Sequence, residues 1–437
     1  MSQRSFVRRR PREFDGTTAA EQAVFDATER LLGETSLQDL TVAKILPEAG
    51  LSRANFYHYF ASKHDVLVAL VARMFDDSYG DDAPWSSTPG RDRARRMGVS
   101  LASTLEMWSR HGAVIGAVIE HMHSQPAVGA AWQKMFAQFV DTVAEQIRYE
   151  RESGSAPDGA PADMVASFLV GAVERSFYVS TRGLDARIPT VEGIAESMRA
   201  LNEAAIYGGR AVDDAPGVDP TAPGVAMAPA PFDDEPDLQS DTPRAILHAM
   251  RELLVDHTLA DLSVAKVLQK AGTSRASFYF YFRSKEDAFV VLFRQEAAGV
   301  VAGLRAFADV DRSDPAALLA QVGQWLNLEG FTGPIIRNAV HEWPRLPELR
   351  TEYLSAMNAM ETALETIIET DRMRGLAPDG PPAPQYAATL LWAIERAVAG
   401  ALAREEHLDD LAAVTTMVGT VLYAAIYGRR GVPPTSV

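Results

Sequence analysis

Serine, arginine, tyrosine and lysine residues recur with one spacing at two places in the 437-residue sequence. The pattern Ser-Arg-Ala-x-Phe-Tyr-x-Tyr-Phe-x-Ser-Lys occupies residues 52–63 and again residues 274–285. Hydroxyl, guanidinium and ammonium groups donate hydrogen bonds that phosphate oxygens and the edges of DNA bases accept. A short helix that displays such groups suits the major groove of DNA. The pattern therefore predicts two DNA-binding segments in one chain.

The residues around each pattern are typical of a helix-turn-helix. In the first copy we expect a short helix from Thr41 to Ala49, followed by a turn at Gly50. Ser52 then caps a second helix that runs to Tyr59. Because apolar side chains at positions i and i+4 face inward, the polar side chains of this second helix are left on the outer surface.

The apolar and polar positions of the second helix have different expected roles. Phe56 and Phe60 are spaced four apart and are expected to be core residues, as are Phe278 and Phe282 in the second copy. The polar positions are the expected DNA contacts. In the first copy these are Thr41, Ser52, Arg53, Asn55, Tyr57, His58, Tyr59 and Lys63, and in the second copy Ser263, Ser274, Arg275, Ser277, Tyr279, Tyr281 and Lys285.

A third helix is expected to begin directly after each pattern. Ser62 and Ser284 each precede an aspartate by three residues, which is the spacing of a capping box. Lys63 and Lys285 then lie in the first helical turn. There the ammonium group and the free N–H groups of the helix could bind one phosphate together.

A basic arm precedes the first copy but not the second. Five of the first twelve residues are arginine, and Arg8, Arg9 and Arg10 are expected to contact DNA because basic arms commonly enter the minor groove or follow phosphates. The second copy instead follows an acidic segment at 233–241. Although the net charge is −16, local basic residues matter more than the total. DNA binding should therefore depend mainly on the first copy.

The repeat extends beyond the DNA-binding segments. Ala156-Pro-Asp-Gly159 returns as Ala377-Pro-Asp-Gly380, and Ala204-Ala-Ile-Tyr-Gly208 returns as Ala424-Ala-Ile-Tyr-Gly428. A Pro-, Ala-, Gly- and Asp-rich segment without hydrophobic periodicity separates the copies and reads as a linker. The expected parts are a basic arm (1–15), a first helix-turn-helix domain (16–62), a first larger domain (63–208), a linker (209–237), a second helix-turn-helix domain (238–284) and a second larger domain (285–430).

Hydrophobic periodicity predicts an all-α protein, because helical spacing is common and strand-like alternation is hardly seen. Glycine and proline residues divide each copy into about nine expected helices. One break is expected at Gly112, before a helix at 113–124, and the last three helices of the first copy are expected near 127–153, 161–182 and 191–207.

The spacing Ala-Gly, Ser, apolar-Tyr-x-x-Phe and x-Ser-Lys at 49–63 and again at 271–285 resembles that of the TetR family of bacterial transcriptional regulators. The resemblance covers nearly the entire chain apart from the linker. It implies two TetR-like units, each with a three-helix N-terminal DNA-binding domain and a larger helical domain for effector binding and dimerisation. It further implies a repressor that a small hydrophobic effector releases from its double-stranded DNA operator. In the family two identical chains pair through their last two helices, whereas here the two halves could pair with each other.

Aromatic and histidine residues of the larger domains are candidates for lining an effector pocket, although core packing is the commoner role of such side chains. The two sets differ in kind, so each half is expected to hold its own pocket with its own ligand. His121 and His123 are spaced i and i+2 on one helix and lack an evident third ligand, so no metal site is expected. The candidates are Trp108, His111, His121, Phe136, Phe139 and Tyr178 in the first half, and Trp325, Phe331, Trp343 and Trp392 in the second.

The sequence offers less support for other classes of function. The sequence contains no cysteine, no GxSxG, no Walker sequence and no GxGxxG, so neither an enzyme nor a cofactor is expected. The lack of a signal peptide and of a long apolar stretch indicates a cytoplasmic protein without a membrane partner. The main alternative is a TetR-like interaction or ligand-sensing protein in which one or both DNA-binding segments are inactive. Polar residues such as Arg53, Asn55 and Tyr57 favour the repressor.

Differences between the two recognition segments predict how DNA would be read. Asn55 stands where the second copy has Ser277, and His58 stands where it has Phe280. Asparagine can make a bidentate contact with adenine that serine cannot. We therefore expect a single-chain pseudo-dimer, joined near 161–208 and 383–427, on a non-palindromic operator. The sequence is also compatible with pairing between two chains, which would give a further homodimer.

Overall fold

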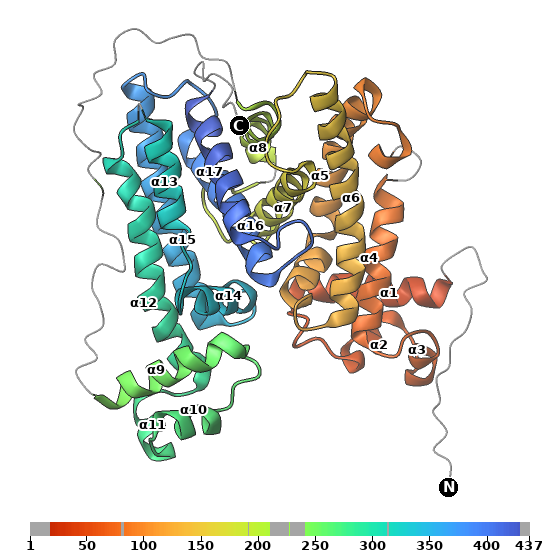
Figure 1. The fold of residues 1–437 in the computed structure, drawn as a ribbon. Coiled ribbons are helices and arrows are strands. Elements are labelled where there is room, and N and C mark those ends of the chain that lie inside the picture. The colour runs from red at the N-terminus through yellow and green to blue at the C-terminus, as the bar shows by residue number, and fades with distance from the viewer. Residues whose placement is uncertain are drawn as a thin grey trace. The chain divides into compact units, whose positions relative to one another are not determined.

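The computed structural model describes residues 18–79, 83–190, 192–209, 227, 241–312 and 314–428. Within these ranges the chain forms helices and no strand, which confirms the all-α class (Figure 1). Arg8, Arg9 and Arg10 lie outside the described residues, as do most of the linker and the acidic segment before the second copy. No described helix is long and apolar enough to cross a membrane. The described residues fall into two compact units, one formed by 18–76 and 113–132 and the other by the remainder.

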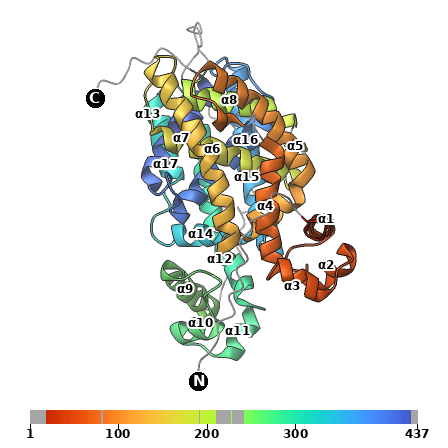
Figure 2. The ribbon, with the colours of Figure 1, turned by 90° about the vertical axis from the view of Figure 1, so that its right-hand side faces the viewer.

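The first unit contains the first helix-turn-helix (Figure 2). Its first helix begins with a capping box, because Glu21 N donates to Thr18 Oγ1 over 3.2 Å and Thr18 N donates to Glu21 Oε2 over 2.9 Å. Phe25 and Ile45 are buried in the small core. The helices are α1 (Ala19–Glu34), α2 (Val42–Ala49), α3 (Arg53–Tyr59) and the first part of α4 (Lys63–Tyr79).

The second helix-turn-helix has the same four elements in the same order and belongs to the second unit. An ion pair between the first and second helices is kept with its charges exchanged. Arg30 pairs with Glu48 in the first copy, and Lys270 Nζ lies 3.0 Å from Glu252 Oε2 in the second. The helices are α9 (Asp241–Asp256), α10 (Val264–Ala271), α11 (Arg275–Tyr281) and α12 (Lys285–Arg305).

The larger domains differ at one predicted break. Gly112 does not end a helix, because α5 (Arg91–His121) continues through it. A Cβ atom at this position would lie 3.4 Å from Thr181 Cβ, so glycine allows α5 to approach α7 closely. The corresponding part of the second copy is divided into two helices. The described residues thus hold eight α-helices in the first copy and nine in the second, rather than nine in each.

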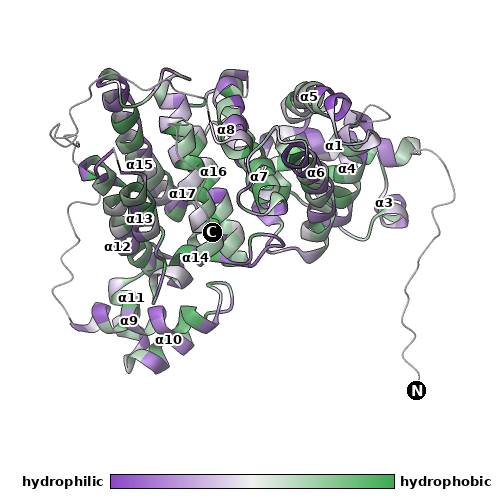
Figure 3. Cartoon of the chain, turned by 45° about the horizontal axis from the view of Figure 1, so that its top comes forward, coloured by the Kyte–Doolittle hydropathy of each residue, from purple (hydrophilic) through white to green (hydrophobic). Residues whose placement is uncertain are grey.

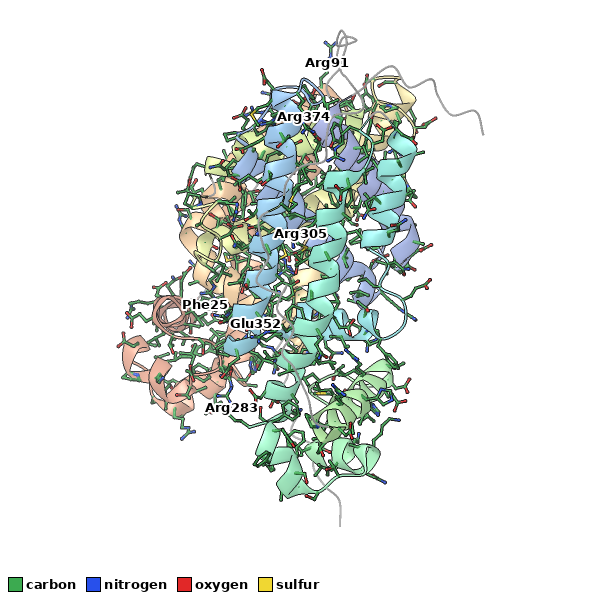
Figure 4. All side chains as sticks on the ribbon, turned by 90° about the vertical axis from the view of Figure 1, so that its left-hand side faces the viewer. Phe25, Arg91, Arg283, Arg305, Glu352 and Arg374 are labelled. Atoms are coloured by element: carbon green, nitrogen blue, oxygen red, sulfur yellow. The ribbon has the colours of Figure 1, made fainter. Side chains whose placement is uncertain are left out.

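The remaining helices build the larger domains, and α12 and α15 run side by side there (Figure 4). Glu352 of α15 accepts a hydrogen bond from Arg294 Nε of α12 over 3.1 Å. In the first copy the helices are η2 (Pro84–Ser86), α6 (Pro126–Glu152), α7 (Ala162–Thr181), η3 (Glu192–Ile194) and α8 (Ala195–Tyr207). In the second copy they are η4 (Ala306–Asp309), α13 (Pro315–Trp325), α14 (Thr332–Glu342), α15 (Pro347–Met373), α16 (Ala383–Ala403) and α17 (Leu411–Tyr427).

The last two helices of each copy pack together within the second unit. Helix α7 lies against α16, and α8 lies against α17. Both α7 and α16 are mostly apolar (Figure 3), and nearly all their residues are buried. Burial of apolar area is the main favourable contribution to such packing, at about 25 cal/mol per Å².

Two buried ion pairs cross the contact between α7 and α16 in a reciprocal manner. Arg175 Nε lies 3.0 Å from Glu395 Oε2, and Arg396 Nε lies 3.3 Å from Glu174 Oε1. The same offset of 221 residues relates Glu174 to Glu395 and Arg175 to Arg396. In a two-fold interface, a residue of one half contacts a second residue of the other half, and the equivalents of these two residues make the same contact with their roles exchanged. The two ion pairs follow this rule.

A loop of the first copy also docks on the second copy. The Arg187 guanidinium, in the segment after α7, donates to Asn358 Oδ1 and Thr362 Oγ1 of α15 over 2.7 and 2.8 Å. Nearby, Trp392 Nε1 of α16 donates to Asp185 Oδ2 over 2.9 Å. These hydrogen bonds tie the copies together at positions that the internal repeat does not duplicate, since Leu408 stands at the position equivalent to Arg187.

Candidate DNA-binding surface and ligand pocket

Local hydrogen bonds hold both recognition helices, α3 and α11, in matching geometry. Ser52 Oγ accepts from Asn55 N over 3.2 Å, and Ser274 Oγ accepts from Ser277 N over 3.0 Å, which confirms the predicted N-caps. Gly50 has the positive φ that the turn requires. Thr41 and Ser263 cap the preceding helices, α2 and α10, in the same manner.

The apolar and polar faces of the recognition helices separate as the sequence predicts. Phe56 and Phe278 are completely buried, and Phe60 and Phe282 are nearly so. The polar candidates of both helices lie on the opposite face. In α3 and its cap the exposed residues are Ser52, Arg53, Asn55, Tyr57, His58 and Tyr59, and in α11 and its cap they are Ser274, Arg275, Tyr279 and Tyr281, with Ser277 half-buried.

Each recognition helix presents a paired arginine and tyrosine at its surface. Arg53 Cζ lies 5.9 Å from the centroid of the Tyr57 ring, and Arg275 Cζ lies 5.8 Å from the centroid of the Tyr279 ring. The two rings are half exposed. A cation held over an aromatic face is restricted in its rotamers, so less conformational entropy is lost when it contacts DNA.

Lys63 does not stand free at a helix N-terminus, contrary to what the sequence suggests. Its Nζ donates to the carbonyl oxygens of Leu37, Gln38 and Leu40 over 2.6, 3.3 and 2.7 Å. An ammonium group has three hydrogens, so these bonds use all of its donors. Desolvation lowers the pKa of Lys63. The side chain holds the loop between α1 and α2 in place.

Lys285 repeats this arrangement in the second copy. Its Nζ donates to the carbonyl oxygens of Leu259, Ala260 and Leu262 over 2.7, 3.1 and 2.7 Å. Both lysines thus bond to backbone carbonyls of their own helix-turn-helix domains, which are partners that the sequence did not indicate. Such partners are hard to predict from a sequence, because every residue has a backbone carbonyl and no residue type marks those that bind a lysine.

The surfaces of α3 and α11 differ at two positions. Ser277 shares a hydrogen bond of 2.9 Å with Ser274, so its hydroxyl is engaged within the helix end, whereas Asn55 carries a longer amide at the same position. Phe280 is 80% exposed where the first copy has His58. An exposed phenyl ring in the last turn of a recognition helix offers apolar contact, such as that with a thymine methyl group.

The second half contains a cavity of about 80 Å³ between α12, α13, α14, α15 and α16. Of the pocket candidates predicted from the sequence, Trp325 lines this cavity. Tyr353 and Met357 also lie in the wall. The other wall residues are Phe293, Ala297, Val300, Val301, Leu326, Leu328, Ile336, Val340, Ala356, Met360, Leu391, Ile394, Glu395 and Val398.

The other candidates of the second half lie elsewhere. Trp343 is fully buried, stacks on Tyr353 at a centroid distance of 5.0 Å and lies 6.0 Å from the Tyr178 ring of the first half. Trp392 is buried and bonded to Asp185. Phe331 is 40% exposed. None of these three residues lines the cavity, and Trp343 and Trp392 lie in the contact between the halves.

The aromatic pocket candidates of the first half pack against other side chains. Trp108 is buried edge-on against Phe177 at 5.8 Å, and Phe139 packs against Tyr79 at 5.2 Å. Phe136 lies beneath the guanidinium of Arg396, whose Cζ is 5.4 Å from the ring centroid. Tyr178 packs against the second half, as described above. His111 and His121 are half-buried and belong to different units, the second and the first respectively.

Sequence reasoning missed the aliphatic part of the cavity wall. Leu391, Ile394 and Val398 share one face of α16, and Met357 and Met360 share one face of α15. Their spacing is visible in the sequence. It cannot separate a cavity wall from ordinary core, because both require the same apolar face.

Models of known protein families match both copies. The model described as "Bacterial regulatory proteins, tetR family" matches residues 24–70 and 246–291, which contain the two helix-turn-helix segments. The model described as "Transcriptional regulator EthR, C-terminal domain" matches residues 98–208 and 333–428, which contain most of the two larger domains.

Individual relatives agree with these matches. The chain is 32% identical to the HTH-type transcriptional regulator EthR of Mycolicibacterium smegmatis over 34% of its own length and 69% of that protein. It is 27% identical to EthR of Mycobacterium tuberculosis over 43% of its own length and 87% of that protein. A crystal structure of regulatory protein TetR from Rhodobacter sphaeroides aligns with 38% of this chain and 90% of that chain, at 22% identity and a TM-score of 0.31.

Proposed function

Because this chain belongs to the TetR family of bacterial regulatory proteins, we propose that it is a ligand-responsive transcriptional repressor that reads DNA with two unlike recognition helices. Helices α3 and α11 would each enter a major groove. A small, mostly apolar effector in the cavity of the second half would lower the affinity for DNA. The expected DNA contacts remain those on the exposed faces of the two helices and on the arm.

The reciprocal ion pairs are the observation that best supports a single-chain pseudo-dimer. Glu174 with Arg396, and Arg175 with Glu395, reproduce within one chain the symmetry that a homodimer makes between two chains. The packing of α7 on α16 and of α8 on α17 buries the surfaces through which a second chain would have to pair. One chain would therefore supply both halves of the DNA-binding assembly.

Covalent linkage removes the need for a palindromic operator. A homodimer presents two identical helices and reads two identical half-sites. Here Asn55 and His58 would face one half-site, whereas Ser277 and Phe280 would face the other. Each good bidentate contact discriminates by about 1–3 kcal/mol, so the two half-sites should differ in sequence.

The test combines binding-site selection from random DNA with light scattering on the bound complex. We expect one chain per site and two unlike half-sites. Two chains on a perfect palindrome would refute the pseudo-dimer, and failure to select any sequence would refute operator binding. A single selected half-site would mean that only one helix-turn-helix reads DNA.

A further inference from the structure

A polar cleft of about 320 Å³ lies where helices of the two halves meet, apart from the cavity described above. Helix α8 of the first half forms one wall, and the ends of α15 and α17 with the start of α16 form the others. Its volume is at the lower end of the range for ligand pockets. The charged side chains that line it are Glu196, Arg199, Glu203, Arg372 and Asp379.

Helix α8 turns a charged face toward the cleft. Glu196, Arg199 and Glu203 are spaced three and four residues apart, so they lie on the same side of the helix, and all three are exposed. Such spacing permits ion pairs along a helix, yet within the described part of the chain none of the three side chains forms one. The five N–H donors of the Arg199 guanidinium therefore have no acceptor among the described residues.

Arg372 supplies a second guanidinium from another wall, at the end of α15. Its Nη1 donates to the Pro381 carbonyl oxygen over 2.7 Å and so holds the turn before α16. Desolvation lowers the pKa of Arg372, while neighbouring carboxylates such as that of Asp379 act in the opposite sense. No carboxylate of the described residues lies close enough to form an ion pair with it. The cleft thus holds two guanidinium groups that lack a counter-ion in contact.

Negative charge gathers at a second place in the cleft. Glu203 lies near the end of α8, and Gly209 N donates to its carbonyl oxygen over 3.2 Å. Gly209 also packs on the end of α17, since a Cβ atom there would lie 2.4 Å from the Ala424 carbonyl oxygen. The carboxyl ends of α8 and α17 therefore meet beside Glu203. Helix carboxyl ends carry partial negative charge and attract cations.

The internal repeat does not reproduce the charged face of α8 in α17. At the positions equivalent to Arg199 and Glu203, α17 carries Gly419 and Tyr423. Gly419 is covered by α13, because a Cβ atom there would lie 3.0 Å from Leu319 Cδ2. The charges of α8 are therefore not a consequence of the duplication, and we expect one such site in each chain.

We propose that this cleft binds a small zwitterion of the amino-acid class, with its carboxylate on Arg199 and Arg372 and its ammonium group on Glu203 at the carboxyl ends of α8 and α17. A simple anion would meet three carboxylates, and a simple cation would meet two guanidinium groups, whereas a molecule with both charges satisfies both sets. The cleft shares no residue with the recognition helices or with the cavity of the second half, so binding there does not depend on the proposed function.

Three probes of nearly equal shape test the proposal by calorimetry on the full chain at low salt. The zwitterion ε-aminocaproate carries both charges, hexylamine carries the cation alone and caproate carries the anion alone. We expect one ε-aminocaproate to bind each chain, about tenfold more tightly than either singly charged probe, because charge-assisted hydrogen bonds form at both of its ends. Equal or tighter binding of hexylamine or caproate would overturn the proposal, as would no binding of ε-aminocaproate.

Two variants test the assigned ends of the ligand. Arg199 forms no ion pair among the described residues, so Arg199→Gln should leave the fold intact. It should weaken the binding of ε-aminocaproate and caproate about tenfold each and leave that of hexylamine unchanged. Glu203→Gln should instead weaken the binding of ε-aminocaproate and hexylamine and leave that of caproate unchanged. The reverse pattern, or no change in either variant, would contradict the proposed orientation.

A matched pair of arginines separates a ligand contact from support of a turn. Arg151 Nη1 donates to the Ala160 carbonyl oxygen over 2.9 Å, as Arg372 donates to Pro381, but Arg151 does not line the cleft. Arg151→Gln and Arg372→Gln should therefore lower thermal stability alike, whereas only Arg372→Gln should weaken the binding of ε-aminocaproate. Equal affinities of the two variants for ε-aminocaproate would remove Arg372 from the site and leave it a role in the turn alone.

Discussion

Lys63 shows how a single side chain can support a helix-turn-helix through backbone carbonyls. Its three hydrogen bonds to Leu37, Gln38 and Leu40 fix the loop between α1 and α2. We expect Lys63→Met to lower the stability of the first helix-turn-helix by about 1–3 kcal/mol, because three carbonyls lose a charged donor. Hydrogen exchange of α1–α3 amides would measure this loss.

The salt dependence of DNA binding separates this role from a phosphate contact. If Lys63 only supports the fold, binding by the folded Lys63→Met variant should keep the slope of log affinity against log salt. A slope smaller by about one unit would show instead that the ammonium neutralises a phosphate in the complex. Lys44→Met is a suitable control, because Lys44 Nζ makes one bond, to the Asp39 carbonyl.

At the scale of elements, the recognition helices should be exchangeable. Replacing Asn55 by Ser together with His58 by Phe gives α3 the side chains that α11 carries at these positions. The doubly substituted chain should prefer more nearly identical half-sites, with a shift of about 1–3 kcal/mol at the base that Asn55 contacts. Binding-site selection would show the change. An unaltered site would mean that these two positions do not read bases.

The end of α16 offers a second test at this scale. Arg404 has φ of 55°, whereas its counterpart at the end of α7, Gly183, has φ of 61°. A left-handed conformation costs a non-glycine residue roughly 1 kcal/mol. Arg404→Gly should therefore raise the free energy of unfolding by about 0.5–1 kcal/mol, and Gly183→Ala should lower it similarly. Urea unfolding would measure both changes. A loss of stability in Arg404→Gly, or a gain in Gly183→Ala, would exclude backbone strain as the explanation.

At the scale of the whole molecule, the buried charges between the halves are the most sensitive point. Arg396 pairs with Glu174 and also lies 2.9 Å from Glu405, and these carboxylates raise its pKa. Arg396→Met would remove the guanidinium with which both carboxylates pair. We expect a loss of about 3–5 kcal/mol in thermal unfolding, together with weaker binding to the two-part operator.

Arg95→Met is the matched control for this substitution. Arg95 pairs with Asp92 at 2.6 Å on the surface, where its side chain is 74% exposed. Surface ion pairs contribute little to stability, so this variant should unfold almost as the unsubstituted chain does. Similar losses in both variants would mean that the contact between α7 and α16 does not depend on its charges.

The sequence by itself determined what depends on neighbours in the chain. Interactions between residues a few positions apart produce the caps at Ser52 and Ser274, the turn at Gly50 and the inward phenylalanines. The two-copy organisation is read directly from the repeated residues. Such interactions are local, so their spacing is written in the sequence. Even the locally plausible break at Gly112 is wrong, because a distant helix, α7, uses that glycine for close packing.

Only the tertiary structure decided which distant groups meet. The repeat supplies Glu174, Arg175, Glu395 and Arg396, but not the crossed pairing between them. Likewise, five helices must come together before apolar stripes enclose a cavity rather than a solid core. Spacing along the chain specifies which face of a helix is apolar. Which partner covers that face depends on how all the helices pack at once, and no local pattern encodes that arrangement.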